Sequence, residues 1–363
     1  MSTTSLDLLR FRDAYFERIW GGHKLAAVLG KDSPPDKVIG EDWLVVDHAE
    51  HESVVAEGPL AGTTLRELVE RDAAALLGTR AELTPHGRFP LLLKLIDAAQ
   101  ALSVQVHPDD AAAERLREPD VGKTERGHVF DADPGSELIC GLEPDADAEA
   151  FARAIEEGAP ERLMRRFEAL EGTTAFVPAG TVHAIGGGLL LSEIQQNSNI
   201  TYRVFDWNRV GADGKPRELH VDKALAVTHF GSSHAGPARP LAYEINGARV
   251  EVLAACGYFA AELLHLDGEV ERDTRGDSFR ILLAKQGPVD VAAGATNYRI
   301  EAGAAALVCG CQESYRASGS GQLLDYYVPD LERDVLVPLR AAGHARDAIV
   351  RLGGAAEASD LAR

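Results

Sequence analysis

FPLLLKLIDAAQALSVQVHPDD, residues 89–110, contains two of the runs that decide the fold. Residues 91–96 and 102–107 each have the length and apolar content of a short strand, and a brief polar stretch separates them. Similar runs, bounded by Gly, Pro and Asp, predict further strands at 42–46, 137–142, 173–177 and 189–195. Strands at this spacing favour an all-β sandwich or barrel over βαβ units.

Helices are expected to interrupt the strands. Leu65, Leu68 and Val69 follow the i, i+3, i+4 spacing of an amphipathic helix. Residues 81–88 include Pro85 and Gly87 and predict a loop. The sequence therefore predicts helical insertions at 63–77, 109–117 and 145–170.

The composition changes after a fourth helical stretch, residues 221–228. Residues 229–240 are rich in Gly, Ser and Pro and predict a linker. Strand patterns resume beyond it at 249–253, 259–266, 279–286, 297–300 and 304–309. We therefore expect a first unit over 1–230 that binds metal, a second β unit over 231–330 without metal, and a tail over 331–363 of unassigned role.

Charge and composition exclude several classes of protein. The chain has 363 residues, 37 basic and 57 acidic, and a formal net charge of -20. Such a charge argues against nucleic-acid binding and against attraction to an anionic membrane. No apolar run reaches the ~18 residues of a membrane span, and the N-terminus does not resemble a signal peptide. The four cysteines lack CxxC spacing, which favours free thiols and a cytoplasmic location.

The strongest local signal for chemistry is LSVQVHPDD, residues 102–110. On a strand, Ser103, Gln105 and His107 point to one face and the apolar residues between them to the other. Polar groups on a buried face need partners, and a metal ion would supply one. A solvent-exposed face would need no such partner, so this segment alone leaves both interpretations open.

Two later segments favour the metal. GKTE, residues 122–125, provides Glu125, with Lys123 on the same face if the segment is extended. VPAGTVHAI places His183 just after a Pro-x-Gly turn. Together with Gln105 and His107 these residues form an N2O2 ligand set that suits a borderline divalent cation, with Zn²⁺ the leading candidate. His128 and His220 are weaker candidates, the latter more typical of a helix start or the surface.

The motifs PxGxxH and QxH…E resemble the two metal motifs of the cupin fold, with Gln in place of the first His. More closely, the chain resembles type I mannose-6-phosphate isomerases of the shorter bacterial form over nearly all of residues 14–328. The resemblance extends through IWGGHKL (19–25), GEDW (40–43), GPLAGTTLREL (58–68), residues 89–110, GKTE (122–125), residues 177–209 and RELHVDKAL (217–225).

This resemblance implies a mainly β fold of two cupin-like β-barrel or jelly-roll domains with short helical insertions. It also implies that Gln105, His107, Glu125 and His183 bind one Zn²⁺ per chain. The resemblance also implies roles for five pocket residues. It implies that Arg203 is essential for catalysis and that Lys123 and Glu193 are acid–base candidates. Ser103 and Arg209 are implied to contact the phosphate.

Plain structural roles compete with some of these assignments. Glu193 could be a hydrogen-bonding partner within a strand, and Arg209 could simply be solvated in its turn. Arg203 would be a buried cation that needs a partner, for which a substrate phosphate or enediolate is suitable. Family members usually carry an aromatic pair just after GKTE, whereas this chain has Arg126, Gly127 and His128 there. This difference puts strict sugar specificity in question.

The implied reaction is interconversion of mannose 6-phosphate and fructose 6-phosphate through a cis-enediol(ate). The expected partner is a small hexose 6-phosphate, and the chain is expected to be a monomer or a weak homo-oligomer. Competing classes are an isomerase of a related sugar phosphate, a non-catalytic sugar-binding cupin, and an Fe²⁺ cupin oxygenase. A negative protein that binds a phosphorylated sugar needs a local cluster of Lys and Arg in its pocket.

Overall fold

The computed structural model describes residues 6–211, 214–231, 236–237, 239–354 and 359–362. Strands dominate it, and the pairings among the described strands are antiparallel. The prediction of a mainly β protein with helical insertions is therefore confirmed. Hydrogen bonding leaves the sheets of the described residues open rather than closing one into a barrel.

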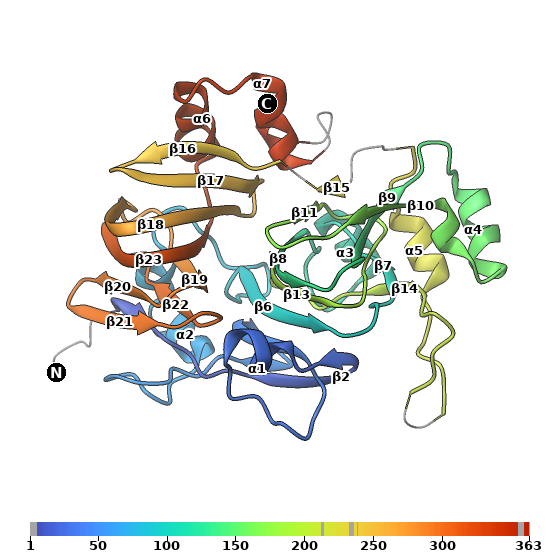
Figure 1. Ribbon diagram of the computed structural model, residues 1–363, viewed down its shortest axis with the longest axis horizontal. Coiled ribbons are helices and arrows are strands. Elements are labelled where there is room, and N and C mark those ends of the chain that lie inside the picture. The colour runs from blue at the N-terminus through green and yellow to red at the C-terminus, as the bar shows by residue number, and fades with distance from the viewer. Residues whose placement is uncertain (1–5, 212–213, 232–235, 238, 355–358, 363) are drawn as a thin grey trace.

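Two facing sheets form the first unit (right in Figure 1). The seven-stranded sheet has the order β15 (Gly236–Pro237), β11 (Thr174–Val177), β8 (Glu125–Ala132), β13 (Leu189–Gln196), β6 (Leu91–Ala98), β3 (Ile39–Val45), β2 (Tyr15–Gly22). The five-stranded sheet has the order β10 (Met164–Glu168), β9 (Glu137–Leu142), β12 (His183–Ile185), β7 (Val104–Val106), β14 (Tyr202–Phe205). A short pair, β4 (Asp47–His48) and β5 (His51–Glu52), lies apart.

A nine-stranded sheet forms the second unit (left in Figure 1). Its main path is β1 (Leu8–Leu9), β22 (Ala305–Val308), β19 (Arg280–Gln286), β23 (Ser314–Tyr327), β18 (Ala260–Asp273), β17 (Ala248–Ala255), β16 (Leu241–Ile245). Off this path, β20 (Val289–Ala293) pairs with β23 and with β21 (Thr296–Ile300). The sheets exchange segments, because N-terminal β1 joins the second sheet and β15, beyond residue 230, joins the first.

Local capping explains where two of the insertions begin. The side chain of Thr64 accepts a hydrogen bond from the Glu67 amide, and the Glu67 carboxylate accepts one from the Thr64 amide. This capping box starts α2 (Leu65–Leu77). At α3 (Asp110–Leu116) the cap is a single hydrogen bond, which the side chain of Asp109 accepts from the amide of Ala112. The remaining α-helices are α1 (Lys24–Leu29), α4 (Ala148–Glu156), α5 (Val221–Val227), α6 (Val337–Ala341) and α7 (Arg346–Val350).

The helix predicted over 145–170 is wrong beyond Glu156. Gly158 adopts a left-handed φ of 71° and Pro160 follows it, so the helix ends there. A short 3₁₀ turn (Pro160–Leu163) leads into strand β10, whose side chains alternate between more and less buried positions. The predicted strand at 102–107 is shorter than expected, since only Val104–Val106 pair as β7.

One hydrophobic core joins the two units. Leu91 and Ile194 of the first belong to the same buried cluster as Leu253 and Leu324 of the second. The tail is helical over much of its length, with a π-helical turn (Leu331–Leu336), α6, α7 and 3₁₀ turns (Arg351–Gly353, Asp360–Ala362). Helices α6 and α7 lie above β16 and β17 in Figure 1. None of the described helices combines the length and apolar character that crossing a bilayer requires.

Candidate metal and sugar-phosphate site

Three of the predicted site residues lie in one row across the five-stranded sheet. His183 of β12 pairs with Gln105 of β7, and Gln105 pairs with Arg203 of β14. Residues directly opposite each other on antiparallel strands project from the same face. Sheet pairing therefore gathers side chains from three segments that are far apart in the sequence.

The seven-stranded sheet supplies the facing residues. Glu125 begins β8, and Glu193 of β13 lies directly opposite Lys94 of β6. All three side chains are buried. The two sheets therefore enclose a group of charged residues instead of a purely apolar core, an arrangement that is costly unless these charges are paired or hold a ligand.

The metal-binding geometry centres on Glu125. Its Oε1 lies 2.9 Å from Nε2 of His183, and its Oε2 lies 3.4 Å from Nε2 of His107. The Nδ1 atoms of His107 and His183 bond to the carbonyl oxygens of Ile200 (2.7 Å) and Thr181 (2.9 Å). Such outer bonds fix the ring orientation and turn both Nε2 atoms toward the carboxylate, as in histidine metal sites. These three side chains can therefore hold one metal ion.

Gln105 completes the set that the sequence predicts. Its side-chain Nε2 lies 3.3 Å from Nε2 of His183. Because the oxygen and nitrogen of an amide are interchangeable by a half-turn, the same position can offer the oxygen to a cation. Gln105 is thus placed to be a fourth, uncharged ligand.

The protonation states at this site suit a cation. Burial alone would raise the pKa of Glu125, but Lys123 and the two histidines hold it well below its usual value. Burial, and then the charge of Lys123, lower the pKa of His107 well below its usual value. A carboxylate and a neutral imidazole are the forms that bind metals.

A cavity of about 320 Å³ opens beside these residues and includes Gln105, Ser103 and Trp20 in its lining. Its carboxylates are Glu41 and Glu193. Its basic side chains outnumber them: Arg18, Lys94, Lys123, Arg203 and Arg217. The local cluster of Lys and Arg that a phosphorylated ligand requires is therefore present, despite the acidic surface of the protein.

Arg203 and Ser103 lie together in this cavity. Nε of Arg203 donates to Oγ of Ser103 (3.1 Å), and Nη1 donates to the carbonyl of Glu218 (3.0 Å). Burial, and then the neighbouring Arg217, lower the pKa of Arg203. Among the described residues, the nearby carboxylate of Asp206 forms its ion pairs with Arg209 and Arg217 instead, which leaves the Arg203 guanidinium suited to an anionic ligand.

Arg209 is not brought to the cavity with the others. Its Nη1 donates to the carbonyl of Ala101 (2.6 Å), and its Nη2 contacts the carboxylate of Asp206 (2.5 Å). Asp206 also holds Arg217 at 2.6 Å. This placement suits a role in supporting the Arg217 position and gives no support to a direct phosphate contact by Arg209.

Sequence reasoning missed the role of Lys94. Its Nζ lies 2.9 Å from Glu193 and 3.3 Å from Glu41, and Glu41 also contacts Arg18 at 2.5 Å. Burial alone would lower the pKa of Lys94, but the two carboxylates raise it above its ordinary value. The signal was available: one lysine within the apolar strand FPLLLKLI must be paired if that strand is buried.

Lys94→Met is therefore expected to destabilise the fold by about 3–5 kcal/mol, because two buried carboxylates lose their shared cation. Urea unfolding followed by circular dichroism measures this change. Lys223→Met is the matched control, since Lys223 pairs with Glu118 at a half-exposed position. Equal stability of the two variants would contradict a stabilising ion-pair network between Lys94, Glu41 and Glu193.

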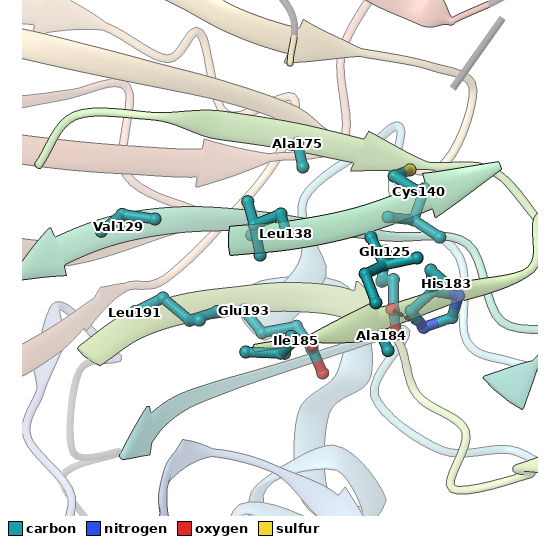
Figure 2. Close-up of a pocket in the computed structure, with 13 residues that line it drawn as sticks. Glu125, Val129, Leu138, Cys140, Ala175, His183, Ala184, Ile185, Leu191 and Glu193 are labelled. Carbon is teal, nitrogen blue, oxygen red and sulfur yellow. Dashed lines mark ion pairs between the residues drawn. The ribbon is translucent and has the colours of Figure 1, made fainter. Parts of the chain in front are cut away.

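Arg126 and His128 follow the candidate ligand Glu125 directly in the sequence, but their side chains do not point toward the candidate metal ligands. Arg126 and His128 project from the face of β8 opposite Glu125, and both are buried. Of residues 126–128, Gly127 alone lines a small, mostly apolar cavity of about 30 Å³ beside the candidate metal ligands. Figure 2 shows Val129, Leu138 and Leu191 along this cavity, with Glu193 and the Glu125–His183 ion pair at one end. The two unusual basic residues are therefore absent from the lining of the larger cavity of about 320 Å³.

Comparison with known proteins shows which family the chain is similar to. Residues 8–127 match the family described as phosphomannose isomerase type I, catalytic domain. The chain is 40% identical over 256 residues to the probable mannose-6-phosphate isomerase GmuF of Bacillus subtilis, covering 69% of this chain and 78% of that one. It is 32% identical over 309 residues to the mannose-6-phosphate isomerase of Streptococcus mutans, covering 85% and 94% of the two chains.

The fold agrees as well. The crystal structure of the mannose 6-phosphate isomerase from Bacillus subtilis superimposes with a TM-score of 0.80 at 30% sequence identity, over 88% of this chain and 99% of that one. Shared sequence over most of each chain, shared architecture and a His–Glu–His cluster inside that architecture all lead to one conclusion. The chain belongs to the family of type I mannose-6-phosphate isomerases.

Proposed function

We propose that this member of the family interconverts mannose 6-phosphate and fructose 6-phosphate, using one Zn²⁺ held by Gln105, His107, Glu125 and His183. One observation carries the proposal: a single cavity contains Gln105 of the ligand set, Lys123, Glu193 and the Arg203–Ser103 pair. The N2O2 donor set suits zinc among the divalent cations. A bound zinc would supply positive charge near the sugar oxygens as negative charge develops there.

The side chains divide the remaining work between them. Aldose–ketose isomerisation transfers a proton between C2 and C1, so a base must reach both carbons on one face of the sugar. Glu193 suits this role by position, because it lines the cavity beside Gln105 and Arg203, and its Oε1 is held 2.9 Å from the buried Lys94 Nζ. Lys123 lies 2.7 Å from Glu125 and is instead placed to hold charge beside the metal ligands.

Arg203 would stabilise the enediolate oxygens as negative charge develops on them. Ser103, which accepts from Arg203, and the basic lining of the cavity would hold the phosphate. Binding energy from the phosphate, remote from C1 and C2, would orient the sugar over Glu193.

The decisive measurement is a coupled assay with mannose 6-phosphate before chelation, after chelation and after zinc is restored. We expect turnover to fall by at least ~10²-fold without metal and to return with about one zinc per chain. Glucose 6-phosphate, which differs at C2, serves as the comparison substrate. Full activity in a metal-free sample would exclude the zinc assignment, and a folded, zinc-loaded but inactive sample would exclude the substrate.

We also propose the finer organisation that the sequence suggested: cupin-like units over 1–230 and 231–330, the second without metal, and a tail over 331–363 of unassigned role. The facing sheets of the first unit support a cupin-like arrangement, although β1 and β15 cross the proposed boundary. The four free cysteines are consistent with a cytoplasmic enzyme. We expect a monomer or weak homo-oligomer, which sedimentation over a range of concentrations would test.

A further inference from the structure

A buried arginine lies between the two units with most of its donors unused. Arg126 has no exposed surface, and its Nε donates to Oγ1 of Thr174 at 2.8 Å. Neither Nη1 nor Nη2 makes a well-formed hydrogen bond to a described protein group, and the polar neighbour that interacts with the guanidinium is the hydroxyl of Tyr326. A guanidinium carries its charge at any physiological pH, so this cation is present in the folded protein.

His128 lies two residues further along the same face of β8. It pairs with Thr174 of β11 on one side and with Ser192 of β13 on the other, so the three side chains share one row. The imidazole is buried, and both Nδ1 and Nε2 lack a hydrogen-bonding partner among the described groups. Two neighbouring polar side chains on one buried face are therefore incompletely satisfied, which is costly without a ligand.

The second unit covers this face with further polar groups. Oη of Tyr326, on β23, lies 3.0 Å from Oγ of Ser192 and interacts with the Arg126 guanidinium. Lys285 of β19 lies near His128, but it is already held by Glu171 (2.7 Å) and Gln322 (2.9 Å). Because Glu171 offsets the charge of Lys285, the unpaired Arg126 leaves the cluster with one buried positive charge in excess.

The other buried arginines of the described residues each form an ion pair with a buried carboxylate. Arg272 contacts Glu262 at 2.6 Å, and Arg280 contacts Asp325 at 3.2 Å. All of these groups are buried. A buried charge normally requires an opposite charge at close range. Among the buried arginines of the described chain, Arg126 is the one without a carboxylate partner.

We propose that Arg126, His128 and Tyr326 form a binding site for one small halide ion, chloride in the cell. A monovalent anion balances the single unpaired cation, and it accepts hydrogen bonds from the Nη groups, an imidazole N–H and a hydroxyl at once. A doubly charged phosphate would leave excess negative charge in a buried site. The site lies on the face of β8 opposite Glu125, so it is distinct from the sugar-phosphate cavity and does not depend on the proposed reaction.

Bromide, an anomalous scatterer, is the direct probe. In crystals of the full chain grown in bromide, we expect an anomalous peak within about 3.5 Å of the Arg126 Nη atoms. In solution, replacing gluconate with bromide at constant ionic strength should raise the Tm by about 2 °C or more through mass action. Absence of the peak together with equal Tm values would overturn the proposal. Stabilisation by phosphate but not by bromide would overturn the choice of halide.

Variants connect the effect to these residues. Arg126→Met should abolish the dependence of Tm on bromide and should fold at least as well without halide, because a buried unpaired charge is replaced by an apolar chain of similar length. Arg299→Met, at a largely exposed arginine, is the control and should keep the full bromide response. His128→Phe provides a second variant, expected to weaken the response. A bromide response unchanged in both Arg126→Met and His128→Phe would refute the site.

Discussion

Glu125→Ala is expected to lose bound metal and at least ~10³-fold of kcat/KM for mannose 6-phosphate. Glu125 is the one carboxylate in the His–Glu–His cluster, and it contacts both histidines and Lys123. Its removal leaves three side chains without negative charge to hold a divalent cation. Changing even an outer-shell partner costs ~10–100-fold in metal affinity, so loss of a direct ligand should cost more.

Metal content by elemental analysis and turnover by the coupled assay, made on the same preparation, measure both effects. Glu137→Ala is the matched control, since Glu137 is half-exposed on β9 and pairs with Arg166. His107→Ala should behave like Glu125→Ala. Stoichiometric zinc with near-normal turnover in either ligand variant would refute the ligand assignment.

Arg203→Ala is expected to keep its zinc and its fold but to lose about 10²–10³-fold in kcat. Arg203 faces the cavity from β14 with its guanidinium held by Ser103 and a backbone carbonyl. Removing one preorganised donor that acts on developing negative charge typically has this effect. The distinguishing feature is a loss mainly in kcat, because the interaction strengthens in the transition state.

Arg209→Ala makes the same chemical change six residues away, where the side chain holds Asp206 and Ala101. We expect Arg209→Ala to lower the Tm. Its effect on KM should be much smaller than the effect of Arg203→Ala on kcat. If Arg209→Ala instead raises KM strongly at unchanged Tm, Arg209 contacts the phosphate as the sequence suggested. Loss of metal or of fold in Arg203→Ala would make Arg203 a structural residue.

Local patterns predict much of the secondary structure. Residues 137–142 are predicted as a strand and form β9 with the same bounds, because alternation and turn residues are readable along the chain. The capping box at Thr64 and Glu67 likewise marks the start of a predicted helix. The long strand β23 (Ser314–Tyr327) is not predicted, since its Gly and Ser residues resemble a loop until pairing with β18 extends it.

By itself, the sequence determined which residue types are available for metal chemistry and which strands carry them. A polar side chain at every second position of an apolar strand is a local property, and so is the spacing within GKTE and PxGxxH. These local properties are sufficient to identify Gln105, His107, Glu125 and His183 as candidate ligands.

Only the tertiary structure decided which of these side chains meet and what surrounds them. Pairing of β7 with β12 and β14 aligned Gln105 with His183 and Arg203, and pairing of β13 with β6 placed Lys94 against Glu193. The same register turned Arg126 away from the candidate metal ligands and toward the second unit. The physical reason is that sheet register and inter-sheet packing depend on contacts between residues far apart in the chain, which no local pattern encodes.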